Sequence, residues 1–506
     1  MSAPTAVDQG ALLRGLARPR VVAPRRTTEN DAGVGYDGPE RRSAEPLAAL
    51  AREHDQLCVE ATDPWEIAAG LEAAGVDDRR ARTEYGHASV FDLAVELFVS
   101  VPRRPPAEPD PTDPWHRPLR HHLLRGVVNA LPAVAYLAAL QVLGPRAELA
   151  PLLVPGVLAA GAGQVLSVLD HLLLGRGERA AARRLVTFTF GGWSLAAAAW
   201  VAAAPLIGVD RDVAFTGAAQ VLYVLAATAL IVTGSDLLLL ALLLPVVGVG
   251  GALLGVHGEL GAALRAWILP VAAGTLVLAL ALALRAHRGG GKARKARVLE
   301  LLSPGEVGLA LECGGYGLAA ALLVAFPLLD ALAGRPAPAL LPVAMAPLLV
   351  TSGVAERLVH GLRGGGLRAL HATTVTTDFA ERARRSLHRA LGVQATVGGL
   401  AGAAAVGGAA VVVPRLVDPR LALLTEACAV LAVVLLLTAL MVSLGQQREA
   451  GLLLGLAVVW DEALRPLLAP TELPLLEMAH VLVVGGTLVA TLAVVRRRYE
   501  SPSAHR

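Results

Sequence analysis

Charge, aromatic residues and cysteine are all scarce in this chain of 506 residues. Only 17% of the residues are charged, 4% are aromatic and three are cysteines. The low charge excludes a charge-rich disordered chain, and three cysteines exclude a disulfide scaffold. A net charge of +3 gives no basis for nucleic-acid binding. Apolar residues are abundant, at 55% of the chain, and this excess indicates an integral membrane protein.

Motifs of enzymes and metalloproteins are missing as well. The chain has no P-loop, no Gly-x-Ser-x-Gly and no His-Glu-x-x-His. Cys58, Cys313 and Cys428 lie too far apart for a metal-binding spacing. His121-His122 is interpreted as a basic cluster at the membrane interface. We therefore expect no enzymatic activity, no catalytic residues, no metal and no cofactor.

Three segments precede the apolar part of the chain. Residues 1–44 are polar and without periodicity, which predicts a disordered tail. Residues 45–100 have helical spacing and helix-capping residues such as Asp63 before Pro64, which predicts a small cytosolic helical domain. Residues 101–118 are rich in proline and predict a semi-rigid linker.

From about residue 124 the chain is a series of apolar runs. Most have the 17–25 residues that a helix needs to cross the hydrocarbon layer, and helices satisfy their own backbone hydrogen bonds there. The fold class predicted is therefore all-α and polytopic. The twelve runs are 124–143, 149–174, 185–207, 213–233, 236–256, 266–285, 306–331, 338–358, 392–413, 421–444, 450–467 and 475–495.

The distribution of basic residues predicts the orientation of these spans. With the amino terminus in the cytosol, the cytosolic loops hold 18 Lys and Arg residues and the outside loops hold seven. Cytosolic loops of membrane proteins carry the basic excess. We expect a multi-pass protein of the cell membrane with both termini cytoplasmic, the carboxyl-terminal tail being residues 496–506.

The spans also divide into two similar halves of six. The first half is 119–285, a basic cytosolic linker follows at 286–305, and the second half is 306–495. The end of span 2, Asp170-His171-Leu172-Leu173-Leu174-Gly175, resembles the end of span 8, Glu356-Arg357-Leu358-Val359-His360-Gly361. Two repeats that both begin on the cytosolic side of the membrane are related by an axis along the membrane normal. This architecture is suited to alternating access.

Polar side chains inside the spans are candidates for the substrate or ion pathway. An ionisable residue at the centre of a span costs about 2.5–3.5 kcal/mol on insertion scales, so a functional role is the first hypothesis. Local salt bridges, capping and interhelical hydrogen bonds are the alternative. The candidates are Asp170, Asp236, Glu312, Glu356, Glu426, Asn129, Gln164 and Gln220.

The segment 378–391 has a different pattern. Phe379, Ala383, Leu387 and Leu391 form one helical stripe, and the arginines Arg382, Arg384, Arg385 and Arg389 lie off it. This pattern predicts an interfacial amphipathic helix on the anionic inner leaflet of the bilayer. A solvated basic face is the alternative.

Twelve spans in two halves with no nucleotide site resemble the multidrug/oligosaccharidyl-lipid/polysaccharide (MOP) flippase superfamily, and within it the PelG-type exopolysaccharide exporters. The stretch Gln164 to Gly175 carries the resemblance, with Asp170 in the polar end of span 2. Val168-Leu169 stand where Arg-Tyr is usual in that family. The resemblance implies a transporter that moves a polysaccharide or glycolipid across the cytoplasmic membrane by alternating access.

Partners and alternatives follow from the same features. We expect residues 45–100 to recruit a cytosolic glycosyltransferase or synthase. One alternative is a non-transporting membrane scaffold or sensor that binds a cytosolic partner, which predicts packed spans without a central cavity. Another is a major-facilitator-like carrier of small solutes, which shares the topology of two halves with six spans each.

Overall fold

The computed structural model describes residues 44–505, apart from residues 62, 102–116, 144–149, 256–257, 288–297, 333–340, 373–375, 413 and 469–473. The described chain divides into two compact units, with the boundary between Thr112 and Asp113. Every element in it is a helix. Outside these residues lie almost all of the predicted tail, most of the predicted linker 101–118 and half of the predicted linker 286–305.

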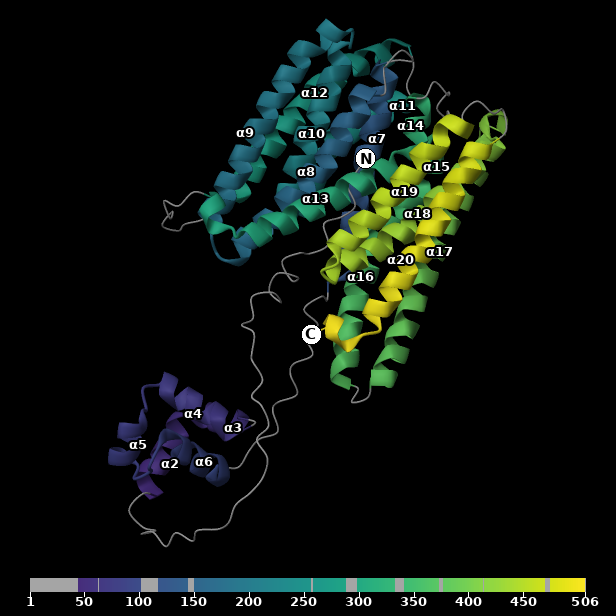
Figure 1. The fold of residues 1–506 in the computed structure, drawn as a ribbon. Coiled ribbons are helices and arrows are strands. Elements are labelled where there is room, and N and C mark those ends of the chain that lie inside the picture. Colours follow the sequence, from purple (N-terminus) through teal and green to yellow (C-terminus); the bar gives the residue numbers. More distant parts are fainter. Residues whose placement is uncertain are drawn as a thin grey trace. The chain divides into compact units, whose positions relative to one another are not determined.

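The smaller unit, called here the helical unit, consists of five short helices (Figure 1). Asp63, Asp77 and Ser89 each accept a backbone N–H hydrogen bond at a helix start, which supplies a partner for an otherwise unpaired donor. Leu93 and Leu97 are fully buried at its centre. The helices are α2 (Ala44–Glu53), α3 (Asp55–Glu60), α4 (Pro64–Ala73), α5 (Asp78–Glu84) and α6 (Val90–Ser100).

The larger unit, called here the membrane unit, begins with six long helices that form its first half. They are α7 (Leu119–Leu143), α8 (Ala150–Gly175), α9 (Arg179–Ala203), α10 (Arg211–Val232), α11 (Asp236–Gly255) and α12 (Gly258–Ala286), with the short η1 (Ala204–Ile207) after α9. Gly234 has a φ of 73°, which lets the chain turn sharply between α10 and α11. This turn is the tight hairpin that two touching apolar runs predict.

The second half follows η2 (Val298–Leu301). It consists of α13 (Pro304–Val324), α14 (Phe326–Leu332), α15 (Leu341–Ala344), α16 (Ala346–Ala372), α17 (Thr376–Val412), α18 (Pro419–Ser443), α19 (Gln447–Leu468) and α20 (Leu475–Tyr499), with η3 (Pro414–Leu416) and η4 (Pro502–His505). The predicted runs 306–331 and 338–358 are each divided into two helices. The run 450–467 is one uninterrupted helix despite Asp461 and Glu462.

The membrane unit has the lengths and compositions that a bilayer requires. In the described residues, seven helical segments are long and apolar enough to cross a membrane, and these lie in α8, α9, α10, α13, α17, α18 and α20. Helices α11 and α12 contain shorter apolar stretches. Together with α7, α16 and α19, these helices coincide with the twelve predicted runs. The predicted fold class, an all-α polytopic membrane protein, is confirmed.

The two halves repeat the same set of helix contacts. In the first half α8 packs on α9 and α10, α10 on α9 and α12, and α11 on α7 and α12. In the second half α16 packs on α17 and α18, α18 on α17 and α20, and α19 on α13 and α20. These contacts correspond one to one when α7–α12 are matched with α13 and α16–α20. The equivalence of spans 2 and 8 expected from the sequence is part of this pattern.

The halves meet through two equivalent helix pairs, α7 on α16 and α8 on α13 (Figure 1). Glycine allows both close approaches. A Cβ atom added to Gly353 of α16 would lie 2.5 Å from the His122 carbonyl oxygen and 2.9 Å from the Cα of Gly126 on α7. A Cβ on Gly317 of α13 would lie 3.0 Å from the Ala160 carbonyl oxygen on α8. Backbones therefore touch directly where the halves join.

Candidate functional site

Polar side chains gather where α7 packs against α16 and α11. The cluster consists of His121, His122 and Arg125 from α7, Asp236 from α11, and Glu356 and His360 from α16, and it is called here the interhalf cluster. Two of the acids predicted from the sequence, Asp236 and Glu356, thus meet in space. Two of its members in direct contact, Arg125 and Glu356, are 231 positions apart in the chain.

Arg125 is placed between the two carboxylates of this cluster. Its Nε lies 3.4 Å from Asp236 Oδ1, and its Nη1 lies 3.3 Å from Glu356 Oε1. His121 repeats the bridge, with Nδ1 at 3.5 Å from Asp236 Oδ2 and Nε2 at 3.7 Å from Glu356 Oε1. Since the side chains of Asp236 and Glu356 are only 5% and 1% exposed, they need these partners to remain charged away from water.

Local sequence explains how the helices present these groups. His121 and Arg125 are four residues apart on α7, and Glu356 and His360 are four residues apart on α16, so each pair lies on one helix face. Asp236 occupies the first turn of α11, directly after the Gly234 turn. A carboxylate is favoured there by the helix dipole. The contact of Gly126 with Gly353 brings the faces of α7 and α16 together.

Asp170, the third acid near a span end, lies apart from this cluster. Its Oδ2 is 2.8 Å from Nε2 of His287, which follows the end of α12, and both side chains are completely buried. His287 Nδ1 contacts the Ala283 carbonyl oxygen at 2.8 Å, so the ring is held from both sides. The predicted equivalence of Asp170 and Glu356 is therefore one of position, because Asp170 stays within its own half.

Glu312 occupies a position in the second half that corresponds to Arg125 in the first. Gln447 Nε2 donates to Glu312 Oε2 at 3.0 Å across α19 and α13, just as Asp236 contacts Arg125 across α11 and α7. Asp236 and Gln447 each follow, by two residues, a glycine with positive φ, Gly234 or Gly445. The Glu312 side chain lies on the protein surface and accepts a hydrogen bond from a neutral amide. The equivalent contact is therefore an ion pair in the first half, whereas in the second half the amide does not neutralise the charge of the carboxylate.

The remaining sequence candidates are dispersed. Glu426 is exposed on α18, whereas Asn129 of α7 and Gln164 of α8 are buried. Gln164 packs against Gly317 where the halves meet, and the amide of Gln220 on α10 packs against Gly156 of α8. These contacts match the structural alternative of packing between helices. Glu426, Gln164 and Gln220 lie on α18, α8 and α10, helices that contribute no residue to the interhalf cluster.

The predicted interfacial helix 378–391 requires a correction. It is the first part of the 37-residue α17, and its apolar stripe packs into the protein: Phe379, Ala383 and Leu387 are at most 2% exposed. The stripe is therefore not available to insert among lipid chains, because α16, α18 and α20 cover it. The predicted arginines Arg382, Arg384, Arg385 and Arg389 do lie exposed on the opposite side.

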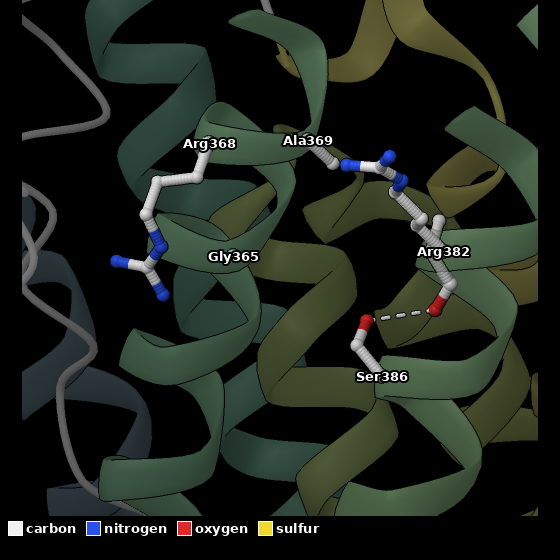
Figure 2. Close-up of a pocket in the computed structure, with 6 residues that line it drawn as sticks. Gly365, Arg368, Ala369, Arg382 and Ser386 are labelled. Atoms are coloured by element: carbon white, nitrogen blue, oxygen red, sulfur yellow. Dashed lines mark hydrogen bonds between the residues drawn. The ribbon is translucent and has the colours of Figure 1, made fainter. Parts of the chain in front are cut away.

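A cavity of about 230 Å³ opens between α16 and α17 beside these arginines. Figure 2 shows Arg368 and Arg382 at its rim and Ser386, whose hydroxyl donates to the Ala383 carbonyl oxygen at 2.8 Å. Arg384 binds Glu500 beyond the end of α20, at 3.0 Å. That hydrogen bond holds the pKa of the Glu500 carboxyl below its usual range. The exposed basic face is therefore partly neutralised by the carboxyl-terminal segment.

A second cavity, of about 550 Å³, lies within the first half. It is almost wholly apolar, and α8, α9 and α10 line it, with Trp193 and Trp200 from α9. Each of these two cavities lies within a single half, the first in the second half and the second in the first half. Neither corresponds to the central cavity between halves that the transport hypothesis predicts.

Several polar partners were not anticipated from the sequence. His121-His122 is not a surface cluster, because His122 is only 3% exposed. Asp461 is buried in α19, where it pairs with Arg465 at 3.3 Å and with the His480 ring of α20. The spacing of four residues between Glu356 and His360, and between Asp461 and Arg465, is the local signal that could have revealed both sets.

The similarity of this chain to known proteins is limited to solved structures of low sequence identity. No family model and no curated protein matches the chain. One solved structure, an outward-facing multidrug resistance MATE family transporter of the MOP superfamily, is 12% identical, has a TM-score of 0.49, and covers 78% of this chain and 96% of its own. A MOP superfamily transporter from Pyrococcus furiosus is also 12% identical, with a TM-score of 0.48 and coverage of 76% and 96%.

Proposed function

We propose that this chain is a MOP-type transporter that moves a polysaccharide or glycolipid across the cytoplasmic membrane by alternating access, without enzymatic chemistry. The observation that carries the proposal is the repeated contact pattern of two six-helix halves, which meet through α7 on α16 and α8 on α13. Transporters built from such repeats work largely by rocking one half against the other. Both termini are proposed to lie in the cytoplasm.

The packing of each half supports rigid-body movement. The largest apolar core lies among α13–α20, and the next largest lies among α7–α12, so each half has a core of its own. The junction between them is polar at the interhalf cluster, where glycines bring the backbones together, and smaller apolar clusters cross it between α8 and α13. Rearranging the junction would break these smaller apolar contacts and leave the core of each half intact, and closed packing of α7 on α16 would seal one end of the pathway.

Glu312 is the residue proposed to couple transport to a cation or a proton. Its carboxylate is exposed from the protein, and Gln447 donates to it without neutralising its charge. Placing a carboxylate in a membrane span costs free energy, so its presence there points to a functional role. Asp170 and Glu356 are proposed to act differently, as polar groups that hold the ends of spans 2 and 8.

The transport proposal predicts a large effect of Glu312→Gln. Cells that produce exopolysaccharide and carry this variant should secrete about tenfold less polymer than cells with the natural chain. Removing the charge while keeping the shape abolishes coupling but leaves the Gln447 contact possible. Secreted hexose is measured and normalised to the amount of protein in the membrane. The matched control is Glu449→Gln, which alters an exposed acid in the first turn of α19.

Two outcomes would contradict the proposal. If cells that lack the chain secrete as much polymer as cells that contain it, the chain does not export that polymer. If Glu312→Gln secretes normally, Glu312 is not the coupling residue. Proteoliposomes that hold only the purified chain separate transport from the scaffold alternative, since a scaffold would not move a fluorescent lipid-linked oligosaccharide across the bilayer by itself.

We further propose that the helical unit binds a cytosolic glycosyltransferase or synthase. It exposes an apolar strip formed by Trp65 of α4 and Phe91, Val95 and Val99 of α6, of which Trp65 is 66% and Val99 79% exposed. The Trp65 and Phe91 rings contact each other at a centroid distance of 5.1 Å. Rigid aromatic groups on a small surface are typical anchors for a protein partner.

Replacing the strip should abolish this recruitment without unfolding the chain. We expect the full-length variant Trp65→Ser/Val95→Ser to retain less than about a tenth of the glycosyltransferase that co-purifies with the natural chain, as for loss of an interface anchor worth more than 1.4 kcal/mol. The readout is quantitative mass spectrometry after crosslinking in membranes. Arg79→Ala, an exposed change on α5, is the control. Unchanged recovery would show that the strip is not the docking surface.

A further inference from the structure

Within the interhalf cluster, three side chains have the composition of a transition-metal site. His122 of α7 and Glu356 and His360 of α16 each offer one ligand atom, and these atoms all lie within 4.8 Å of one another. All three residues are at most 5% exposed. Two imidazoles and one carboxylate form the set of protein ligands found in many zinc sites that keep a fourth position open.

The backbone holds these donors in a favourable arrangement. Glu356 and His360 are four residues apart, so both project from one face of α16. The contact of Gly126 with Gly353 brings α7 close enough for the rings of His122 and His360 to lie with centroids 5.3 Å apart. Ligands of a tetrahedral ion at about 2.0–2.1 Å are about 3.4 Å from one another. Small rotations of the side chains would close that difference.

We propose that His122, Glu356 and His360 bind one divalent ion of the zinc class, which links the two halves of the membrane unit. A mixed nitrogen and oxygen set favours such an ion over Mg²⁺ or Ca²⁺, which take oxygen ligands. His121, whose Nε2 lies 3.7 Å from Glu356 Oε1, or a water molecule would complete the coordination.

Neighbouring charges support the same arrangement. Arg125 Nη1 contacts Oε1 of Glu356 at 3.3 Å, and a carboxylate has a second oxygen to offer the ion. Asp236 contacts His121, as carboxylates that orient metal-binding histidines do. With neutral histidines, the charges of Asp236 and Glu356 exceed that of Arg125, and the exposed Arg357 beside Glu356 offsets the excess. The ion would stabilise the packing of α7 on α16 by joining donors from both helices.

The test is direct metal binding by the purified full-length chain, with no affinity tag, in detergent micelles. After removal of metal with a chelator, the protein is titrated with Zn²⁺ by calorimetry, and with Co²⁺ by absorption, which reports four-coordinate geometry. We expect one ion per chain. His122→Ala and His360→Ala should each weaken binding by at least about 10–100-fold, the loss typical for removing even an outer support of a metal site.

Matched variants keep the inference falsifiable. His388→Ala removes an exposed histidine of α17 and should leave the affinity unchanged. His360→Cys replaces one zinc ligand by another and should retain binding, even where His360→Ala lowers the melting temperature. Binding that persists in the His122→Ala/His360→Ala double variant, or the absence of binding by the folded natural chain, would overturn the proposal. Both results are independent of any transport measurement.

Discussion

Replacing Arg125 with alanine is expected to destabilise the membrane unit by about 3–5 kcal/mol, the cost of breaking a buried ion pair. Arg125 lies between Asp236 and Glu356, and both carboxylate side chains are at most 5% exposed. Without the guanidinium, two acids would face each other at the α7–α16–α11 junction beside His121 and His122. The melting temperature of the purified protein in detergent measures this loss.

The variant Arg125→Ala/Asp236→Asn/Glu356→Gln separates charge from packing. Because neutral amides need no counter-ion, it should recover most of the stability that Arg125→Ala loses. Arg357→Ala is the control, since Arg357 is the exposed arginine next to Glu356. If Arg125→Ala melts like the natural chain, or if the triple variant is no more stable than the single one, the network does not hold the halves together.

The second large effect is expected from Gly353→Ala. The added methyl group would lie 2.5 Å from the His122 carbonyl oxygen and 2.9 Å from the Cα of Gly126. Since both neighbours are backbone atoms, no side chain can move aside, and α7 must separate from α16. Overpacking of this kind costs about 1–3 kcal/mol. Moving α7 would also lengthen the contacts of Arg125 with Glu356, so secretion in the export assay should fall in parallel.

Gly361→Ala provides the comparison on the same helix. No atom lies within 4 Å of the Cβ position of Gly361. Alanine is the better helix former, so this variant should be as stable as the natural chain or up to about 1 kcal/mol more stable. Equal melting temperatures for Gly353→Ala and Gly361→Ala would mean that the backbones of α7 and α16 do not meet closely in the folded protein.

Local features of the fold were predictable from the sequence. Asp63, placed before Pro64, was expected to cap a helix, and its side chain does accept the Glu66 backbone N–H. Membrane helices follow from apolar length, since each span must satisfy its own backbone and cover the hydrocarbon layer. Charged residues weaken that signal. In the run 450–467, Asp461 and Glu462 interrupt the apolar pattern, although Asp461 is paired with His480 inside the protein.

The candidate site was only partly predictable, because a single span does not reveal its neighbours. Rarity of charge singled out Asp236, Glu356 and Glu312, but not Arg125, which lies at the edge of span 1. The stripe of Phe379, Ala383 and Leu387 has the same spacing whether it contacts lipid or protein. The choice between these surroundings is made by the packing of α16, α18 and α20 on the stripe, which the spacing within α17 does not reveal.

The sequence by itself determined that this protein is a helical membrane chain, where its spans lie and that its two halves are alike. The first two properties depend on composition and periodicity within about 20 to 30 residues, and the third depends on a short motif that recurs in both halves. Only the tertiary structure decided that Arg125 neutralises Asp236 and Glu356, that His122 and His360 meet, and that Asp170 binds His287 instead. These pairings depend on which helix faces come together, and glycines such as Gly126 and Gly353 set that distance through backbone contact across more than 200 residues of chain.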